Sequence, residues 1–318
     1  MSAACKVSIC IPTFNRPELL TDCLDSCVAQ THGNLEILVG DDSHDDCTRT
    51  LIQTRYAHDA RILYRKNEPS LGQARNVASL FERATGDKIL LIHDDDYLVL
   101  DGVEAMLDLW RTHPHLDAAF GNQYTIDSAG RIDRAISDRF NADYRRTLET
   151  EGMQTLPGRT GLIQMFPNNG WIANADLVKR VGYRHDVGTC CDFVFGAELC
   201  IEAKHVYYLH RYVSFYRHGE VSISNSTRGT LHSAPIKAFE FVKGLQLSPL
   251  LEPARRTSLR RLAPIVVSLY ARNHSPLVAL RIAIAHLYAY RYGMSARFYY
   301  HLSLIARSLI TRMTRRTA

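Results

Sequence analysis

The last part of the sequence lacks acidic residues. All 33 aspartates and glutamates lie at or before Glu252, whereas the residues from Pro253 onward include 12 arginines and no lysine. The formal charge is therefore −7 up to Glu252 and +12 after it. A block with this bias predicts an anionic partner, either an anionic membrane surface or the acidic part of the same chain. No nucleic-acid recognition motif is present, so we expect no nucleic-acid partner.

Long apolar runs and paired cysteine motifs are also missing. No window shows 18 uncharged apolar residues, so we expect no membrane-spanning helix, and the first residues lack the pattern of a signal peptide. The eight cysteines form no paired CxxC set with zinc spacing. We expect reduced thiols and a cytoplasmic location, with the inner face of the cell membrane as a peripheral position.

What is present is the composition of a globular protein, with 46% hydrophobic and 22% charged residues. Short apolar runs alternate with amphipathic helical patterns in the first half, which predicts an α/β fold with a mainly parallel sheet covered on both sides. The expected strands are residues 6–12, 35–42, 61–67, 87–96 and 116–127, and the expected helices begin at residues 17, 70 and 101.

The second half has a less regular pattern. Residues 161–166, 168–182 and 190–203 favour helices or helix starts, whereas residues 205–218, rich in tyrosine and valine, favour a strand. The last 65 or so residues predict helices that break near Pro264 and Pro276.

Polar clusters follow three of the expected strands. They are Pro12–Thr13, Asp41–Asp42 and Asp94–Asp96. Ligands bind beyond the carboxyl ends of the strands in such sheets, so we expect one shared site at this rim.

The run Asp94–Asp96 offers hard oxygen ligands suited to Mg²⁺ or Mn²⁺, which could grip a diphosphate. An acidic surface turn is the alternative. On an extended chain Asp94 and Asp96 share a face, which favours those two as ligands.

Asp41–Asp42 could cap the next helix or accept the N3–H of a uracil or thymine ring. Arg75, near a helix start, suits either phosphate oxygens or solvent.

Four motifs of this sequence, in their order along the chain, resemble those of the inverting family 2 glycosyltransferases. The motifs are "VSICIPTFNRPELLTDCLDSCVAQ", "EILVGDDS", "NEPSLGQARN" and "ILLIHDDDYLVLDGV", within about the first 125 residues. A looser match continues through "GWIANADLVKRVGYRHDVGTCCDFVFGAEL" and "FYRHGEVSIS". The resemblance implies the A-type glycosyltransferase fold, in which a Rossmann-like nucleotide-binding half joins an acceptor half.

The resemblance also implies roles for the matching positions. Donor or nucleotide binding falls to Pro12, Thr13, Arg16, Asp41, Asp42, Arg75 and Asp94. The acidic run corresponds to the family's DxD-type metal motif. When this sequence is aligned with the family motif on Asp101, His93 takes the place of the first acidic residue, and Asp95 becomes the main metal ligand. Asp96 and His218 are the further metal-binding residues. This conflicts with the preference for Asp94 and Asp96 on an extended chain, and a turn in the chain would favour Asp95.

Asp192 matches the family's catalytic base, although Cys191 replaces the glutamate that usually precedes it. A structural role as a helix N-cap is the alternative. An inverting transfer needs one carboxylate to take the proton of the acceptor hydroxyl, while the metal stabilises the leaving diphosphate.

The positions that match the family's acceptor pocket are Asn169, Gly170 and Trp171. Trp171 could stack on a sugar or belong to the core.

These observations predict a metal-dependent inverting hexosyltransferase that uses Mg²⁺ or Mn²⁺. It would move a sugar from a nucleotide-diphosphate sugar, UDP or dTDP type favoured, to a hydroxyl of a carbohydrate or lipid-linked acceptor in polysaccharide or glycolipid assembly. A sugar-phosphate nucleotidyltransferase and a non-catalytic nucleotide-sugar-binding protein are alternatives. A nucleotidyltransferase would have a glycine-rich loop after the first strand, but the segment there, "IPTFNRPE", has no glycine. We expect a donor part at residues 1–125, an acceptor part at 126–235 and a basic helical region at 236–318.

Overall fold

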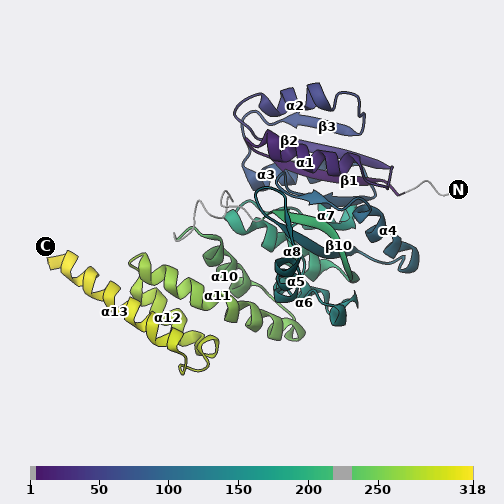
Figure 1. Cartoon of the computed structure of the whole chain (residues 1–318). Coiled ribbons are helices and arrows are strands. Elements are labelled where there is room, and N and C mark those ends of the chain that lie inside the picture. Colours follow the sequence, from purple (N-terminus) through teal and green to yellow (C-terminus); the bar gives the residue numbers. More distant parts are fainter. Residues whose placement is uncertain (1–4, 218–230, 318) are drawn as a thin grey trace. The chain divides into compact units, whose positions relative to one another are not determined.

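The structure of the chain, a computed structural model, describes residues 5–217 and 231–317 (Figure 1). The chain divides into two compact units. The first comprises Met1–His185 with Cys191–Gly219, and the second comprises Asp186–Cys190 with Glu220–Ala318. The division expected at residues 125 and 235 has other boundaries than these two units, and residue 235 lies inside a helix of the second unit.

The first unit is built on one ten-stranded sheet with the order β3-β2-β1-β4-β9-β6-β10-β5, to which β7 and β8 add at β6 and β10. The strands are β1 (Val7–Thr13), β2 (Leu35–Asp41), β3 (Ile62–Lys66), β4 (Lys88–Leu91), β5 (Tyr97–Leu98), β6 (Ala118–Ile126), β7 (Ile132–Asp133), β8 (Gly152–Met153), β9 (Trp171–Asn174) and β10 (Val206–Arg217). β3, β2, β1 and β4 are parallel, as are β6 and β10. The expected mainly parallel sheet is confirmed.

The helices of the first unit are α1 (Pro17–Val28), α2 (Cys47–Arg55), α3 (Gln73–Arg83), α4 (Gly102–Thr112), α5 (Arg134–Asp143), α6 (Pro157–Leu162), α7 (Ala175–Val181) and α8 (Cys191–Glu202). Most of these helices follow the predicted pattern, but α5 was not predicted, and the helix expected at residues 161–166 lies earlier and ends at Leu162. Pro17 begins α1, where its fixed φ fits and its missing N–H costs nothing. Leu20, Cys23, Leu24 and Cys27 form the buried stripe of that helix. They pack with the apolar side chains of β1 and β2 into one core.

Residues 171–174 differ from the prediction, because they form strand β9 rather than the start of a helix. β9 runs antiparallel to both β4 and β6, between which it lies. A stretch of three apolar residues and one asparagine has no periodicity that distinguishes strand from helix, so only the neighbouring strands decide its form. The helix expected here begins later, at Ala175.

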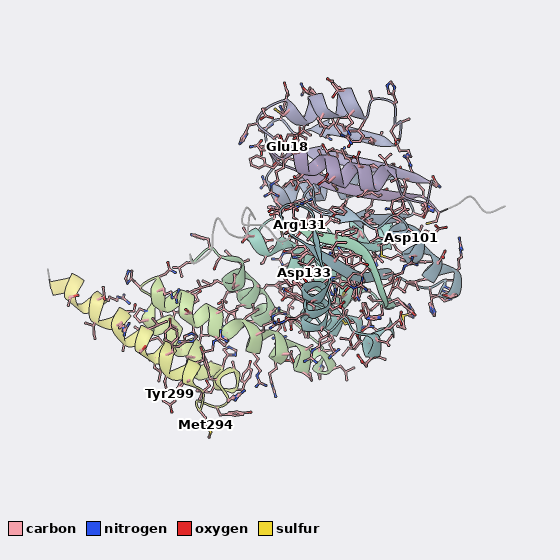
Figure 2. The ribbon with its side chains drawn as sticks, viewed as in Figure 1. Glu18, Asp101, Arg131, Asp133, Met294 and Tyr299 are labelled. Carbon is pink, nitrogen blue, oxygen red and sulfur yellow. The ribbon has the colours of Figure 1, made fainter. Side chains whose placement is uncertain are left out.

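The second unit contains α10 (Ala234–Gly244), α11 (Glu252–Arg272), α12 (Pro276–Ala285) and α13 (Ala296–Thr317). Pro276 begins α12 as expected, but α11 continues through Pro264 instead of breaking there. Pro264 is buried beside Ala263, Val266 and Val267, and this packing offsets the hydrogen bond that a proline removes. Met294 and Tyr299, labelled in Figure 2, are 84% and 63% exposed. Across the described residues, every helix is too short or too polar to cross a bilayer.

Candidate active site

Polar side chains from separate strands meet at one rim of the sheet, as the sequence predicts. Thr13 ends β1, Asp41 ends β2, and residues 93–96 follow β4. Two further segments lie at the same rim: residues 169–170, which precede the antiparallel strand β9, and Arg217, which ends β10.

Asp94 is buried at this rim and holds the loop after β1. Its carboxylate accepts hydrogen bonds from the Thr13 hydroxyl at 2.8 Å and the Phe14 N–H at 3.4 Å. The Arg16 guanidinium lies 3.5 Å from Asp94 and 3.0 Å from Asp95. Burial, together with the charge of Asp95, raises the pKa of Asp94 to about 6, against the opposing effect of Arg16. Asp94 and Arg16 therefore connect the β1 loop to the acidic run.

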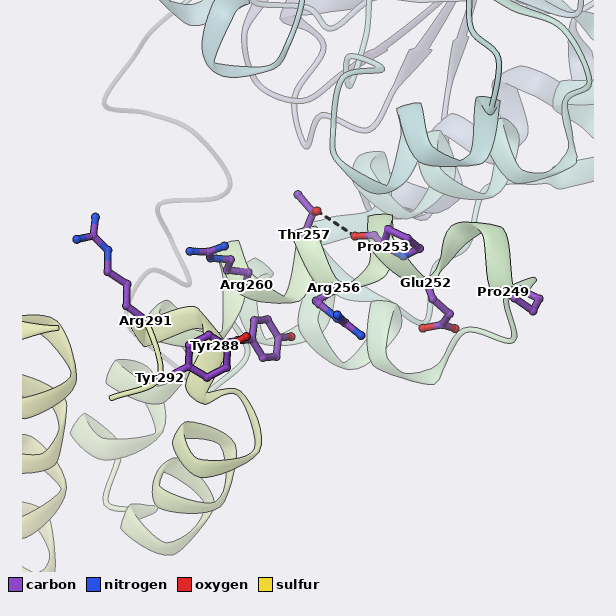
Figure 3. Close-up of a pocket in the computed structure, with 9 residues that line it drawn as sticks. All are labelled: Pro249, Glu252, Pro253, Arg256, Thr257, Arg260, Tyr288, Arg291 and Tyr292. Atoms are coloured by element: carbon purple, nitrogen blue, oxygen red, sulfur yellow. Dashed lines mark hydrogen bonds between the residues drawn. The ribbon is translucent and has the colours of Figure 1, made fainter. Parts of the chain in front are cut away.

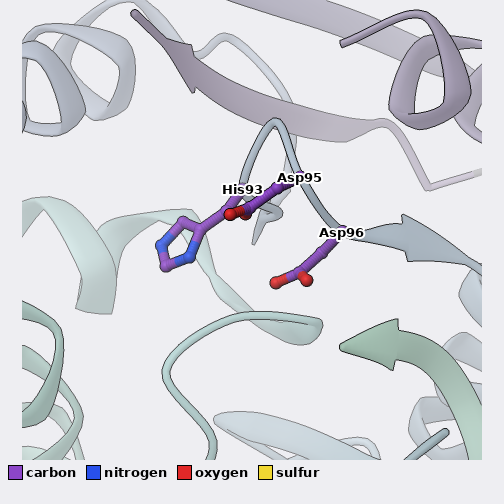
Figure 4. A group of neighbouring side chains, drawn as sticks. All are labelled: His93, Asp95 and Asp96. Carbon is purple, nitrogen blue, oxygen red and sulfur yellow. The ribbon is translucent and has the colours of Figure 1, made fainter. Parts of the chain in front are cut away.

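Asp95, Asp96 and His93 form a group with the geometry of a metal site (Figure 4). Each offers one ligand atom, and these atoms lie within 4.8 Å of one another. Two carboxylates and an imidazole are a donor set that accepts Mn²⁺ or Mg²⁺. Asp95 is the most accessible aspartate of the run, because its side chain is 27% exposed while Asp94 and Asp96 are buried.

Both oxygens of Asp96 are already engaged. Oδ1 accepts the Arg217 N–H at 2.7 Å, and Oδ2 accepts the Asn169 amide at 2.7 Å. Burial and the neighbouring charge of Asp95 raise the pKa of Asp96 above its ordinary value, despite these hydrogen bonds. Arg217 also donates to the Asp95 carbonyl at 3.0 Å and lies 3.0 Å from the Asp22 carboxylate. Arg217 therefore fixes the backbone of the acidic run.

His93 lies between the acidic run and Asp192. Its Nδ1 is 3.0 Å from the Asn169 amide, and its Nε2 is 3.4 Å from Asp192 Oδ1. Burial alone would lower the pKa of His93, but the charges of Asp192, Asp96 and Asp95 outweigh it and raise the pKa to about 10. Within the described residues Asn169 Oδ1 is buried without a hydrogen-bond partner. A buried amide oxygen beside two carboxylates fits a cation as its partner.

Asp192 stands in the first turn of α8, as expected of a catalytic base. The Tyr183 hydroxyl donates to its Oδ1, and the Gln73 amide lies 3.5 Å from its Oδ2. Burial would raise the pKa of Asp192, but the charge of His93 and the hydrogen bonds from His93 and Tyr183 prevail, so the pKa falls below its ordinary value. Asp192 is thus an ionised carboxylate at neutral pH.

Asp41 and Asp42 organise the neighbouring loops. Asp41 accepts the Ser43 N–H at 2.9 Å and the Tyr64 hydroxyl at 2.7 Å. Asp42 accepts the Ser70 hydroxyl at 2.8 Å, and the Leu71 and Gly72 N–H groups at 2.8 and 2.6 Å. Asp42 therefore holds the loop that leads into α3, where Arg75 is exposed in the first turn.

The expected acceptor residues occupy different environments. Asn169 is buried and bridges His93 and Asp96. Gly170 has φ +74, and its N–H donates to the Leu91 carbonyl at 2.7 Å. Trp171 is 0% exposed and packs on Phe81, Phe166 and Phe195. A ring so enclosed has no free face for a sugar. His218 lies outside the described residues.

Sequence reasoning did not select Tyr183, Gln73 or Arg217 as site residues. Arg217 ends a predicted strand, so the same argument from strand ends could have found it. No sequence signal identifies Tyr183 or Gln73. Their contacts with Asp192 span 9 and 119 residues of chain and depend on how the loop after α7 and the start of α3 meet α8.

The site lies at the carboxyl ends of a Rossmann-like sheet and contains an acidic group that could hold a metal ion. Comparisons with known proteins identify the family. Residues 8–168 match the model of Glycosyl transferase family 2. The chain belongs to this family and is a glycosyltransferase. It is 25% identical over 223 residues to an uncharacterized glycosyltransferase of Haemophilus influenzae, covering 69% of this chain and 82% of that protein. Seven further curated relatives are matched over only 18% to 43% of their own length.

Solved structures share the fold over most of the chain. Staphylococcus aureus TarS 1–349 in complex with UDP matches with a TM-score of 0.64 at 14% identity, covering 95% of this chain and 88% of that one. The mannosyltransferase PcManGT of Pyrobaculum calidifontis, in complex with GDP-Man and Mn²⁺, matches with a TM-score of 0.62 at 13% identity, covering 97% and 86%. These neighbours confirm the A-type glycosyltransferase fold.

Proposed function

We propose that the protein is a metal-dependent, inverting glycosyltransferase that moves a sugar from a nucleotide-diphosphate donor to an acceptor hydroxyl. One observation carries this proposal: the ionised Asp192 lies beside the candidate metal group, with His93 contacting both. A single displacement needs a base on the acceptor side and a cation at the leaving diphosphate, and both must be close together.

Asp95 is the main ligand of the proposed metal and Asp96 is the second. The raised pKa of His93 favours its protonated form, so His93 ligates the metal only after it loses a proton. Asp95 has the most accessible carboxylate, and the ligand atoms of the three residues cluster within 4.8 Å. His218 stays a predicted ligand. A bound Mg²⁺ or Mn²⁺ would supply charge stabilisation for the leaving diphosphate. The Mn²⁺ complex of PcManGT supports this assignment.

The donor would lie over the ends of β1, β2 and β4. Thr13 and Asp94 fix one loop there, Asp42 fixes the loop that leads into α3, and Arg75 is exposed at the start of that helix. A guanidinium beside a helix N-terminus suits phosphate oxygens. We favour a UDP or dTDP sugar. The UDP complex of TarS supports the uracil nucleotide, while the GDP-Man complex of PcManGT shows that the fold accepts other bases.

Asp192 would act as the general base. Its carboxylate takes the proton of the acceptor hydroxyl as the oxygen attacks the sugar, on the face opposite the leaving diphosphate, which inverts the anomeric centre. Tyr183 and His93 hold the carboxylate in place. The acceptor would be a carbohydrate or a lipid-linked glycan in polysaccharide or glycolipid assembly, bound near Asn169 and Gly170.

Replacing Asp192 by asparagine tests this proposal. Transfer should fall by roughly 100-fold or more, because general-base catalysis typically contributes that much, while the Kd of the donor stays near the wild-type value. Donor binding is first identified by thermal shift with a panel of nucleotide sugars, with and without Mn²⁺. Unchanged transfer by the variant would remove Asp192 from the mechanism. A wild-type chain that no nucleotide sugar stabilises would contradict the proposal as a whole.

A further inference from the structure

A pocket in the second unit is lined by arginine and tyrosine side chains, and it uses no residue of the site described above (Figure 3). Its volume is about 570 Å³, which is within the range of small-molecule sites. It lies between the N-terminal half of α11, which contributes Arg256 and Arg260, and the turn after α12, which contributes Tyr288, Arg291 and Tyr292.

The charge of the pocket is strongly positive and uncompensated. Arg256 and Arg260 are four residues apart on α11, so they lie on one face of the helix. Glu252 is the one carboxylate among the lining residues, and its Oε1 is 3.3 Å from Arg255. Within the described residues, Arg256, Arg260 and Arg291 have no carboxylate partner at ion-pair distance. Three exposed guanidinium groups therefore remain available to an anion from outside.

The two tyrosines give the pocket an aromatic wall. Tyr288 is partly buried, and its hydroxyl lies 3.0 Å from Nδ1 of His286. Burial raises the pKa of Tyr288, while the charges of Arg256 and Arg260 act against it, so both guanidinium groups lie near this ring. Tyr292 is 77% exposed. Arg291 and Tyr292 have φ values of +53 and +59, a left-handed turn that is uncommon for such residues.

We propose that this pocket binds a phosphate ester, with the phosphate on the arginines and the organic part against the tyrosines. Guanidinium groups match phosphate oxygens through paired, charge-assisted hydrogen bonds. Tyrosine rings provide contact area for a sugar or an acyl chain. The organic part is thus either a sugar or a lipid. The proposal does not depend on the transfer reaction, because the donor site contains none of these residues.

Calorimetric titration of the full chain with three probes tests the proposal: inorganic phosphate, glucose 1-phosphate and dihexanoyl phosphatidic acid. The pocket variant combines Arg256→Ala with Arg260→Ala. The matched control combines Arg281→Ala with Arg307→Ala, which removes the same charge from exposed positions of α12 and α13 outside the pocket. The Kd for the bound esters should rise by roughly tenfold or more in the pocket variant only, because hydrogen bonds to charged groups are strong.

A third variant, Tyr292→Ala, separates the organic part from the phosphate. Ester binding should weaken while binding of inorganic phosphate stays unchanged. Tighter wild-type binding of the lipid ester assigns a lipid headgroup, and tighter binding of glucose 1-phosphate assigns a phosphorylated glycan. Equal losses in the pocket and control variants would overturn the proposal, because they would show attraction to the surface charge alone. A wild-type chain that binds neither ester would also overturn it.

Chemical labelling tests the proposal on the wild-type chain, so the result does not depend on whether a variant folds. Phenylglyoxal modifies exposed arginines, and mass spectrometry reports each site. The bound ester should protect Arg256, Arg260 and Arg291 but leave Arg281 reactive. Equal labelling with and without the ester would contradict the pocket assignment.

Discussion

At the scale of single residues, the three aspartates of the acidic run have different roles although they are adjacent in the sequence. Asp94 bonds to the β1 loop and Asp96 to Asn169 and Arg217, whereas Asp95 contacts the Arg16 guanidinium and remains the most accessible. The extended-chain argument favoured Asp94 and Asp96. The chain turns after β4, and the Asp96 N–H donates to the His93 carbonyl at 3.1 Å, so strict alternation of side chains does not apply here.

Replacing Asp95 by asparagine should weaken Mn²⁺ binding, because the proposed site loses its most available charged ligand. We expect the Kd for Mn²⁺ to rise by roughly tenfold or more, measured by calorimetry or electron paramagnetic resonance on the free protein. Asp108→Asn serves as the control, since Asp108 pairs with Arg111 on the surface of α4. An Asp95 variant with wild-type Mn²⁺ affinity would exclude Asp95 as a ligand.

Gly170→Ala should destabilise the protein more than Gly182→Ala. Both glycines have positive φ, +74 and +68, so alanine is strained at either position. A Cβ at Gly170 would lie 2.5 Å from the Ser214 hydroxyl, whereas a Cβ at Gly182 meets nothing within 4 Å. Strain alone should cost about 1 kcal/mol at each position, and the contact adds to it at Gly170. Equal free energies of unfolding by urea would disprove the steric argument.

At the scale of elements, a buried carboxylate connects β1, β2 and the turn before β4. Glu36 in β2 accepts hydrogen bonds from the Ser8 hydroxyl, the Lys6 amine at 2.7 Å and the Thr85 hydroxyl at 2.6 Å. Burial would raise the pKa of Glu36, but these hydrogen bonds outweigh it and lower the pKa to about 2. The ionised form is thus favoured by the folded state.

Glu36→Gln should lower the free energy of unfolding at pH 7 by about 2 kcal/mol. The pKa of Glu36 is lower in the folded chain than in the unfolded chain, where it is near 4.5, so Glu36 contributes stability at pH values above 4.5. This contribution is lost as the pH falls towards 2. The difference between variant and wild type should therefore shrink from pH 5 to pH 2, as followed by urea unfolding. Glu82→Gln, at an exposed position of α3, is the control. A difference that is independent of pH would contradict the linkage.

At the scale of the whole molecule, the second unit combines positive charge with exposed apolar side chains. Leu277 is 59% exposed, Ile284 56% and Ile310 62%, and all 12 arginines after Pro253 belong to this part of the chain. We propose that this unit contacts an anionic membrane surface, where each surface arginine contributes about 1 kcal/mol. The phosphate-ester pocket is a separate proposal, since surface attraction requires no defined cavity.

Sedimentation with vesicles tests the membrane proposal. The protein should bind vesicles that contain phosphatidylserine and be released by about 0.5 M salt, because salt screens charges at such surfaces. Neutral phosphatidylcholine vesicles should bind far less. Equal partition onto both kinds of vesicle would show that the arginines do not direct the interaction.

The sequence by itself determined six strands of the sheet, β1, β2, β3, β4, β6 and β10, and the rim that carries the site. Alternating apolar runs and helical stripes depend on local periodicity, which a single chain displays, and strand ends then place Thr13, Asp41 and Asp94–Asp96 together. Only the tertiary structure decided what surrounds them. β9 forms because two strands flank it, Trp171 enters the core, and Tyr183, Gln73 and His93 converge on Asp192. Such contacts join segments far apart in the sequence, and no local pattern encodes the packing that brings them together.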